Sequence, residues 1–460
     1  MSTVLVLATT TGYQTRAFGD AAERLGVDLV FATDRCHLIE DPWQDHAIPI
    51  RFYDEDTSVA AIIESARERP IDGVIAVGDR PTVIAARVAD ALGLSFHSPD
   101  AAAIARDKRR TRECLRDAGL PVPWFLPFDT RIANPESRLA AADTQAPTPL
   151  AYPCVLKPVA LSGSRGVMRV DDDRALAAAL ERLRAIVESP DVRAERNDAH
   201  AFALLEKFIP GREYALEGLM HQGALQVLAV FDKPDPLDGP FFEETVYVTP
   251  SVAPDGTRAA IVDAVTRAAA AIGLEHGPIH AECRVNAEGV FVLEVAARPI
   301  GGLCARALSF TSDGIRDSGI GSRESAVGRI PNPDSRIPLE ELLLRHALGE
   351  NPARYRREDA ASGVMMIPIP RRGLFRGVDG VEAARSVPHI ADIQITAKPD
   401  QRLLPLPEGA SYLGFIFARA RRAADVDAAL RAAHARLHFA IDPEFRVLDA
   451  AQMHYNLHHG

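Results

Sequence analysis

Two acidic residues, Glu282 and Glu294, each lie in a short apolar stretch rich in valine and other β-forming residues. Both stretches are typical of β-strands, and Gly289 between them can supply the positive φ that a three-residue hairpin loop needs. If residues 287–289 form that loop, Glu282 lies directly opposite Glu294, with the two Cβ atoms roughly 5 Å apart. The spacing therefore predicts a pair of neighbouring carboxylates.

Two bare carboxylates at that separation would repel each other, and a hard divalent cation with oxygen ligands would relieve the repulsion. Magnesium usually arrives with nucleotide phosphates and is held by only one or two protein carboxylates. The pattern thus predicts a metal site at Glu282 and Glu294. Two alternatives stay open from the hairpin alone. The acids are unrelated and solvated, or a loop of two or four residues places them on opposite faces.

A second segment has the composition of a phosphate-binding turn. Lys157 ends an apolar strand, and a Ser/Gly loop and another strand follow it. Backbone amides of such a loop can donate to phosphate oxygens, and a lysine adds a compact positive charge. The loop is neither a Walker A motif nor a Gly-x-Gly-x-x-Gly turn. An ordinary hairpin turn is the competing interpretation. The loop residues of interest are Ser162, Gly163, Ser164 and Gly166.

Two further elements precede the paired acids along the chain. An apolar strand ends at Glu206, runs into a Pro-Gly turn, and is followed seven residues later by a second acid, Glu213. Upstream, Lys108 stands at the start of a predicted helix that ends near residue 117. Each element is weak evidence singly, but their order along the chain is specific.

This ordered set, over roughly residues 1–305, resembles the ATP-grasp superfamily. The resemblance implies an ATP-grasp fold in which Lys108 is the first nucleotide-binding lysine and Lys157 the second, on a mobile lid. It also implies that the Ser/Gly loop is the glycine loop of that lid. By the same resemblance the two hairpin acids hold magnesium, with manganese as an alternative.

The resemblance also implies a site for the rest of the nucleotide. The strand that ends at Glu206 resembles the hinge strand that binds adenine and ribose in these enzymes. Glu206, Lys207 and Phe208 would then line the adenine pocket, and Glu213 would accept hydrogen bonds from the ribose hydroxyls. The implied cofactors are ATP and Mg²⁺.

The second metal strand departs from a common ATP-grasp pattern. Many members have Glu-x-Asn there, whereas this chain has Glu294 followed by Ala296. The run that continues through Arg298 to Gly301 and Gly302 resembles the L-amino acid ligases and related carboxylate–amine ligases. In that branch an arginine faces the acyl phosphate, which makes Arg298 the expected catalytic residue. The missing Asn leaves the coordination of the metal open.

The reaction implied is ATP-dependent ligation of a carboxylate to an amine through an acyl phosphate, with release of ADP and phosphate. A carboxylate and an amine, both expected to be amino acids, are the implied substrates. Residues expected near them are His280, Lys233, Gly301 and Gly302. A structural histidine is the favoured alternative for His280, and a solvated turn explains Lys233 as well. The alternatives are a biotin carboxylase-type reaction and a noncatalytic ATP-binding module. The first lacks support because that family's Glu-Arg-Asp-Cys-Ser run is absent.

Composition agrees with this interpretation. The chain has 460 residues, 47% of them apolar, which is long enough for two to four domains. A formal charge of −11 argues against nonspecific binding to nucleic acid or membrane surfaces. Five dispersed cysteines without a C-x-x-C pair, and the absence of a signal peptide or long apolar run, favour a cytoplasmic location. A homodimer is left open.

The predicted fold is α/β, or α+β overall. Alternating strand and helix patterns predict a parallel N-terminal domain. Ser98 followed by Pro99 predicts a capped helix start. A helix with Leu176, Leu180, Leu183 and Val187 on one face is expected to cover the lid sheet. A second helix, with Ile261, Val265, Ala268 and Ile272 on one face, is expected to pack behind the metal strands. Polar loops are expected at 133–149 and 309–336. Strands and a final helix are expected after residue 363. The expected organisation is an N-terminal α/β domain at 1–97, connecting helices at 98–124, a lid at 125–205, a catalytic core at 206–345 and a C-terminal ligase-type domain at 346–460.

Overall fold

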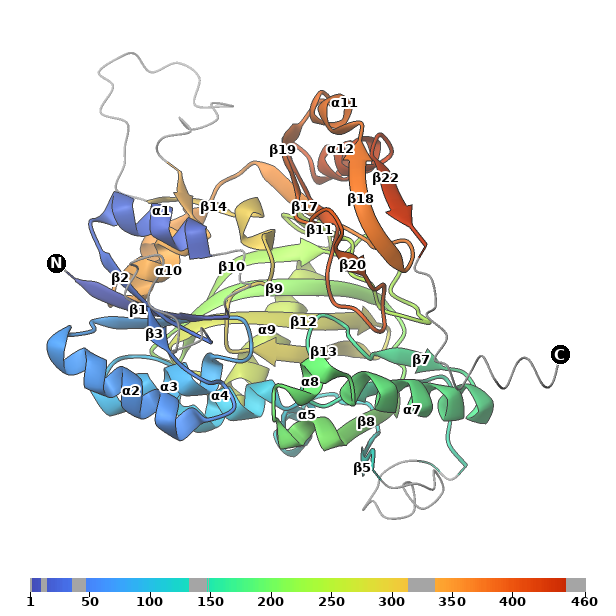
Figure 1. Ribbon diagram of the computed structural model, residues 1–460, viewed down its shortest axis with the longest axis horizontal. Coiled ribbons are helices and arrows are strands. Elements are labelled where there is room, and N and C mark those ends of the chain that lie inside the picture. The colour runs from blue at the N-terminus through green and yellow to red at the C-terminus, as the bar shows by residue number, and fades with distance from the viewer. Residues whose placement is uncertain are drawn as a thin grey trace.

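The structure is a computed structural model, and it describes residues 2–9, 15–34, 47–131, 147, 149–312 and 336–443. The predicted loop at 133–149 lies outside the described residues apart from 147 and 149. No described helix is both long and apolar enough to cross a membrane. Figure 1 shows the N-terminal elements on one side, the lid and the C-terminal elements on the other, and a long twisted sheet between them.

The N-terminal part is a small parallel α/β unit, as the alternating pattern predicted. Its sheet has the order β3-β2-β1-β4 with all pairs parallel. The strands are fully or largely buried, which explains their continuous apolar runs. The elements are β1 (Thr3–Ala8), α1 (Thr15–Leu25), β2 (Asp28–Thr33), β3 (Ile48–Pro49), α2 (Glu55–Glu68), β4 (Gly73–Val77) and α3 (Thr82–Leu92).

Two capped helices connect this unit to the rest of the chain. In α4 (Pro99–Arg106), Ser98 is the N-cap and proline occupies the first helical position, as predicted. In α5 (Lys108–Asp117), the Asp107 carboxylate accepts from the backbone amides of the first turn. This cap fixes Lys108 as the first residue of its helix.

The predicted lid is a four-stranded antiparallel sheet of order β5-β8-β6-β7, covered by α7 (Asp173–Val187). Leu176, Leu180 and Leu183 of α7 are buried against the sheet, as their helical spacing predicted. The remaining elements are β5 (Phe125–Asp129), β6 (Cys154–Pro158), β7 (Met168–Val170), α8 (Pro190–Arg193), the 3₁₀ helix η1 (Asp198–Ala201) and β8 (Phe202–Lys207).

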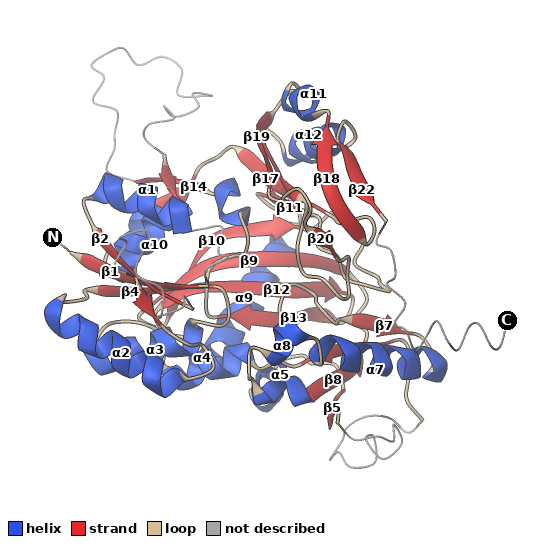
Figure 2. Cartoon of the chain, in the orientation of Figure 1, coloured by secondary structure: helices blue, strands red, loops and turns tan. Residues whose placement is uncertain are grey.

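The core is an eight-stranded antiparallel sheet of order β13-β12-β9-β10-β11-β17-β21-β19. Helix α9 (Asp255–Ile272) buries Ile261, Val265 and Ala268 behind the strands of the acidic hairpin, as predicted (Figure 2). The strands are β9 (Arg212–His221), β10 (Ala224–Asp232), β11 (Val246–Thr249), β12 (Gly277–Asn286), β13 (Gly289–Ala296), β17 (Ala361–Ile367), β19 (Ile390–Ile395) and β21 (Gly414–Ala420).

The strand-rich C-terminal part is continuous with the core, because its strands β17, β21 and β19 extend the same sheet. Helix α12 (Ala423–His434) packs on those strands. The stretch from 309 was predicted to be a loop, but its first four residues form β14 (Ser309–Ser312), which pairs with β15 and β16. The other elements are η2 (Cys304–Ala307), β15 (Ile337–Pro338), α10 (Leu339–Ala347), η4 (Pro352–Arg354), β16 (Tyr355–Arg357), β18 (Gly373–Asp379), α11 (Val381–Arg385), β20 (Arg402–Leu403) and β22 (His438–Asp442).

Candidate active site

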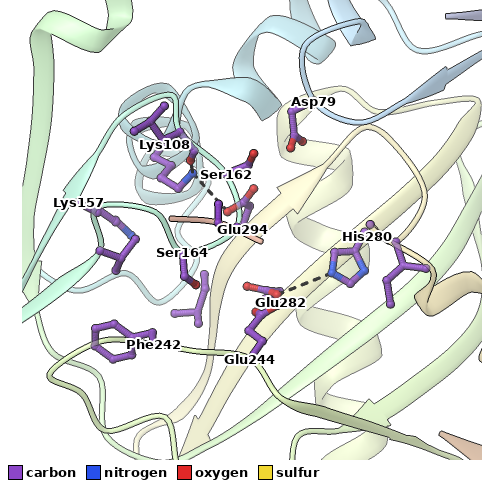
Figure 3. Close-up of a pocket in the computed structure, with 18 of the residues that line it drawn as sticks. Asp79, Lys108, Lys157, Ser162, Ser164, Phe242, Glu244, His280, Glu282 and Glu294 are labelled. Atoms are coloured by element: carbon purple, nitrogen blue, oxygen red, sulfur yellow. Dashed lines mark hydrogen bonds and ion pairs between the residues drawn. The ribbon is translucent and has the colours of Figure 1, made fainter. Parts of the chain in front are cut away.

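A cavity of about 540 Å³ lies where the N-terminal unit, the lid, the core sheet and the C-terminal part meet. Every site residue predicted from the sequence except Lys233 and Gly166 lines this cavity. Figure 3 shows side chains from the lid and from the acidic hairpin pointing toward one another across it. The lining residues predicted from sequence are Lys108, Lys157, Ser162, Gly163, Ser164, Glu206, Lys207, Phe208, Glu213, His280, Glu282, Glu294, Arg298, Gly301 and Gly302.

The acidic hairpin pairs Glu282 with Glu294 as predicted, but by a different route. The predicted three-residue loop is wrong, because Asn286 pairs with Gly289 and only two residues lie between the strands. A β-bulge at Leu293, between the pairs Cys283–Val292 and Glu282–Glu294, adds one residue to the second strand. That extra residue restores the alignment that the shorter loop would have removed.

Three carboxylates and one lysine form a buried cluster beside this hairpin. The Nζ atom of Lys233 donates to Glu213 at 2.8 Å, to Glu244 at 2.7 Å and to Glu282 at 2.8 Å. The hydroxyl of Tyr247 also donates to Glu244 at 2.9 Å. One carboxylate oxygen from each acid lies within 4.8 Å of the others. Lys233 is shared by three acids, but Glu213 also pairs with Arg284 at 2.9 Å and Glu282 lies 3.7 Å from His280. Among the described residues, Glu244 is the acid of this cluster whose cationic contact is the shared lysine alone.

The pKa values of this cluster follow from burial and from these contacts. Burial and the neighbouring Glu282 raise the pKa of Glu244 to about 7. Burial opposes the charge on Lys233, but the surrounding carboxylates outweigh it and raise the lysine pKa above its usual range. Burial likewise opposes protonation of His280, yet its contacts with Glu217 (Nδ1, 3.1 Å) and Glu282 (Nε2, 3.7 Å) raise its pKa to about 9. His280 is therefore a cation at neutral pH.

Glu294 faces a different cation. The Nζ atom of Lys108 lies 3.5 Å from the Glu294 carboxylate and donates to the backbone carbonyl of Leu161 at 2.8 Å (Figure 3). Helix α5 thus brings its first residue between the acidic hairpin and the start of the Ser/Gly loop. The lysine and the acid predicted from separate motifs are direct neighbours.

The second predicted lysine is buried in an ion-pair network on the lid. Lys157 donates to Glu206 at 2.5 Å, and Arg112 donates to both Glu206 oxygens at 3.0 and 3.3 Å. Burial lowers the pKa of Lys157 to about 8. Burial would raise the pKa of Glu206, but Arg112 and Lys157 lower it to about 2. The Glu206 carboxylate is therefore ionised and already engaged by two cations.

The Ser/Gly loop connects β6 to β7 as a run of turns, and Ser162, Gly163 and Ser164 face the cavity. Gly166 does not line it. A Cβ atom at Gly166, whose φ is +74°, would lie 3.0 Å from Leu183 and 3.2 Å from Pro158. This glycine allows the loop to pack closely beneath α7.

Beyond the loop, the predicted adenine and ribose residues lie on one wall of the cavity. Phe208 stacks with Phe242 at 6.4 Å between ring centroids, and the guanidinium of Arg284 lies 5.1 Å from the Phe208 ring. The Nε atom of Arg284 donates to Glu213 at 2.9 Å, opposite the contact from Lys233. Glu213 is thus held by two cations at the edge of an aromatic wall.

Arg298 reaches the cavity, but not by continuing the strand. The extended conformation does not continue to Arg298, because β13 ends at Ala296 and a bend follows. From this bend Arg298 donates to both carboxylate oxygens of Asp79, at 2.8 and 3.2 Å, and to the carbonyl of Pro299. Burial opposes ionisation of Asp79, but Arg298 outweighs it and lowers the Asp79 pKa.

The two glycines after Arg298 line the cavity next to the C-terminal part. Gly302 has a φ of +61°, and a Cβ atom there would lie 3.2 Å from the Phe415 ring. A larger residue would therefore be strained and would crowd the aromatic side chain.

The cavity residues that sequence reasoning missed include Asp79, Glu244, Tyr412 and Phe415. Asp79 follows the carboxyl end of parallel strand β4, the edge at which open α/β sheets bind ligands, so a signal for it existed. Glu244 precedes β11 next to another acid, and nothing local distinguishes the two. The aromatic residues come from the C-terminal part and reach the cavity only through the shared sheet.

Lysine usage points to the same cavity. The chain has only five lysines among its 52 basic residues. Lys108, Lys157 and Lys207 line the cavity, and Lys233 binds the carboxylates beside it. Only Lys398 lies elsewhere. The other basic residues of this protein are arginines. Four of the five lysines are therefore concentrated at or beside the cavity, where compact cations lie close to acids.

Comparison with known proteins identifies the architecture. Family profiles match an ATP-grasp N-terminal domain at residues 19–96, an ATP-grasp domain at 150–307 and an L-amino acid ligase C-terminal domain 2 at 365–442. The chain belongs to the ATP-grasp superfamily and is of the L-amino acid ligase type. This agrees with the resemblance and with the fold expected from it.

Among solved structures, this ATP-grasp protein is similar to the L-amino acid ligase from Bacillus licheniformis. The two share 26% identity and a TM-score of 0.73, over 96% of this chain and 99% of that one. The uncharacterised protein y4rH of Sinorhizobium fredii is 23% identical over 96% of this chain and 84% of its own length. Alanine–anticapsin ligase of Bacillus subtilis is 27% identical over 55% of this chain, which spans only 53% of that ligase.

Proposed function

We propose that this ATP-grasp protein is an ATP-dependent ligase that joins a carboxylate to an amine, with amino acids as the substrate class. In the proposed reaction the substrate carboxylate attacks the γ-phosphorus of ATP and releases ADP. The resulting acyl phosphate is attacked by the amine, which forms the amide bond and releases phosphate. The L-amino acid ligase profile at 365–442 and the similarity to a solved ligase of that type support this class.

The observation that carries the proposal is the meeting of two differently charged walls in one cavity. The lid and α5 supply Lys157, Lys108 and the Ser/Gly loop, which suit phosphates. The core sheet supplies Glu282 and Glu294, which suit a divalent cation. Phosphoryl transfer depends mainly on such positioning and charge neutralisation, so no protein nucleophile is required.

The acidic residues fit magnesium. Glu282 and Glu294 lie opposite each other in the hairpin, and a carboxylate oxygen from each of Glu244 and Glu213 lies within 4.8 Å of Glu282. Burial and the nearby Glu282 carboxylate raise the pKa of Glu244, and a divalent cation would relieve the repulsion between these two acids. When bound, magnesium would neutralise the phosphate oxygens and align them for transfer. Lys233 would hold Glu282 and Glu244 in place.

Arg298 is proposed to face the reacting carboxylate and phosphate. Its guanidinium is buried and oriented by Asp79, which binds two of its nitrogens. A guanidinium can donate two parallel hydrogen bonds to a carboxylate or phosphate, which a lysine cannot. The neighbouring Gly301 and Gly302 leave space for a substrate beside it, and Tyr412 and Phe415 supply an apolar boundary.

The proposed adenine site lies on the hinge between lid and core. The strand β8 ends with Glu206 and Lys207, and Phe208 follows as part of the aromatic wall. Glu213 is proposed to meet the ribose, with Arg284 and Lys233 orienting its carboxylate. The domain limits predicted from the sequence, with a lid at 125–205 and a catalytic core at 206–345, are part of this proposal.

A phosphate-release screen tests the function. All pairs of proteinogenic amino acids are incubated with enzyme, ATP and Mg²⁺, and productive pairs are examined by mass spectrometry for the amide product. We expect at least one pair to give ADP, phosphate and amide in equal amounts. The folded Glu294→Ala variant is the matched control and should give none. No amide and no substrate-dependent ADP from any pair would favour a noncatalytic nucleotide-binding role.

A further inference from the structure

Three histidines from separate parts of the chain meet outside the active site. His221 ends β9, His276 lies in the turn before β12, and His346 lies in the last turn of α10. The Nδ1 atom of His221 is 3.2 Å from the Nε2 atom of His346. The His276 and His346 rings stack with centroids 4.3 Å apart, and the His221 ring lies 5.3 Å from each of them.

This cluster is separate from the carboxylate cluster. Glu217 contacts His280, and His221 lies four residues beyond Glu217 on the same strand. At a rise of about 3.3 Å per residue, the Cα atoms of His221 and Glu217 are about 13 Å apart. The described residues contain only two groups of three or more side chains that could hold a metal ion. One is the set of catalytic-site carboxylates, and the other is these histidines.

We propose that His221, His276 and His346 form a binding site for a zinc-like transition-metal ion. One ring nitrogen from each histidine lies within 4.8 Å of the other two. Zinc binds imidazole nitrogens at about 2.0–2.1 Å in tetrahedral geometry, which places two ligand nitrogens about 3.3 Å apart. The 3.2 Å separation between His221 and His346 already matches that spacing. The His276 ring would have to rotate out of its stack with His346 to bring in the third nitrogen.

Burial supports a ligand at this place. His276 is only 8% exposed, and its Nε2 atom is buried without a hydrogen-bond partner among the described residues. An unpaired polar atom in the interior costs free energy, and a metal ion would satisfy it. His346 is 2% exposed, whereas His221 is half-buried. The half-buried ligand gives an ion a route of entry and leaves room for water as a fourth ligand.

The charge state of the rings is also suitable. Burial and the neighbouring histidines lower the pKa of His346 to about 3, and burial lowers the pKa of His276. The two rings are therefore neutral at pH 7, and neutral imidazole is the form that binds metals. Imidazole ligands suit zinc, copper and nickel better than magnesium, so this site would not compete for the nucleotide's cation.

A metal here would fasten α10 to the core sheet. Helix α10 packs against β12 and also against α1 and β4 of the N-terminal unit (Figure 1). Two of the three ligands belong to the core, at the end of β9 and before β12, and the third belongs to α10. An ion bound by all three would therefore link the core to the helix that contacts the N-terminal unit. The expected role is structural.

The test is a zinc titration of chelator-treated protein in saturating Mg²⁺, which occupies the carboxylate site. We expect one zinc per chain and a higher melting temperature. His221→Ala should weaken zinc binding about a hundredfold, since one of three protein ligands is lost. Glu282→Gln and the exposed His438→Ala are controls that should keep wild-type zinc affinity.

A second variant, in which cysteine replaces the ligating histidine, keeps the test decisive if His221→Ala folds poorly. His221→Cys should still bind the metal, and with Co²⁺ it should show a thiolate-to-cobalt charge-transfer band that wild type lacks. No stoichiometric zinc binding in wild type, or equal zinc affinity in folded wild type and His221→Ala, would overturn the proposal. Absence of the thiolate band in cobalt-loaded His221→Cys would do so as well. The three rings would then be only a packed cluster.

Discussion

Replacing Lys233 with methionine should destabilise the metal-free protein far more than it destabilises the magnesium-bound protein. The side chain is 3% exposed and its Nζ atom contacts three carboxylates at 2.7–2.8 Å. Removing one partner from a buried ion pair typically costs about 3–5 kcal/mol, because the remaining charge is left without compensation. We expect a loss of about that size at pH 8 in chelator-treated protein.

Magnesium should reverse much of that loss. Mg²⁺ would supply to the variant the positive charge that Lys233 supplies in wild type, so it should bind the variant more tightly. At the same saturating concentration, a hundredfold tighter Kd stabilises the variant by about 2.7 kcal/mol more than wild type. The loss should also shrink at pH 6, where protonation of Glu244, whose pKa is about 7, removes one of the charges left behind. Urea unfolding followed by circular dichroism, with and without Mg²⁺ at both pH values, measures these differences.

Lys398→Met is the matched control, since it is the same substitution at an exposed lysine away from the cavity. Its effect should stay within about 0.5 kcal/mol under all four conditions. The reasoning fails if Lys233→Met loses the same stability with and without saturating Mg²⁺. It also fails if Lys233→Met is no less stable than the control. That result would mean that Lys233 does not stabilise the fold by neutralising the carboxylates around it.

Four further predictions follow from the same site. Glu294→Ala should abolish ADP formation with an unchanged circular dichroism spectrum, and Glu282→Ala should act in the same direction; near-normal turnover of folded Glu294→Ala would contradict the metal assignment. Mg²⁺ affinity, measured by calorimetry, should rise as pH passes through about 7, because Glu244 must lose its proton to bind a cation, and Glu244→Gln should lack this step. In the metal-free protein the raised pKa of Glu244 makes the free energy of unfolding change with pH in the opposite direction. The native state holds a proton that the unfolded state has lost, so the stability of the fold falls as pH rises toward 7. Strands β6 and β7 should become more protected from hydrogen exchange with a nonhydrolysable ATP analogue, and equal exchange at saturating nucleotide would argue against lid closure. Arg298→Lys should leave ATP affinity nearly unchanged and slow amide formation by about tenfold to a thousandfold, whereas a stable, fully active variant would remove Arg298 from the mechanism.

The fold was largely predictable because its elements have strong local signals. Buried parallel strands gave continuous apolar runs, and the caps at Ser98 and Asp107 fixed two helix starts. The helical spacing in α7 and α9 identified the faces that pack on the lid and the core. The sharing of one sheet by the core and the C-terminal part could not be predicted, because strand pairing between distant segments has no local signature.

For the acidic hairpin, the predicted pairing of the two acids is correct although the predicted loop length is wrong. Glu282 does pair with Glu294, but the loop is one residue shorter than predicted and a bulge at Leu293 compensates. The alternation of apolar and polar residues cannot distinguish these two arrangements. Arg298 likewise reaches the cavity through a bend and a contact with Asp79, not along a strand. Its position depends on a residue more than two hundred positions away.

Residues brought in only by tertiary packing had the weakest sequence signals. Glu244 completes the carboxylate cluster because β11 pairs with β10, and no local pattern separates it from its acidic neighbour. The three histidines likewise come from two strand ends and a helix terminus, with no shared motif. Such sites become visible only when the elements are placed in space.

Isotope transfer from the substrate carboxylate to phosphate tests the proposed reaction most directly. With a productive amino acid pair, the acid is labelled with oxygen-18 in its carboxylate, and the released phosphate is analysed by mass spectrometry. Formation of an acyl phosphate requires one labelled oxygen to leave with the phosphate, together with ADP. Unlabelled phosphate, or release of AMP and pyrophosphate, would contradict the account.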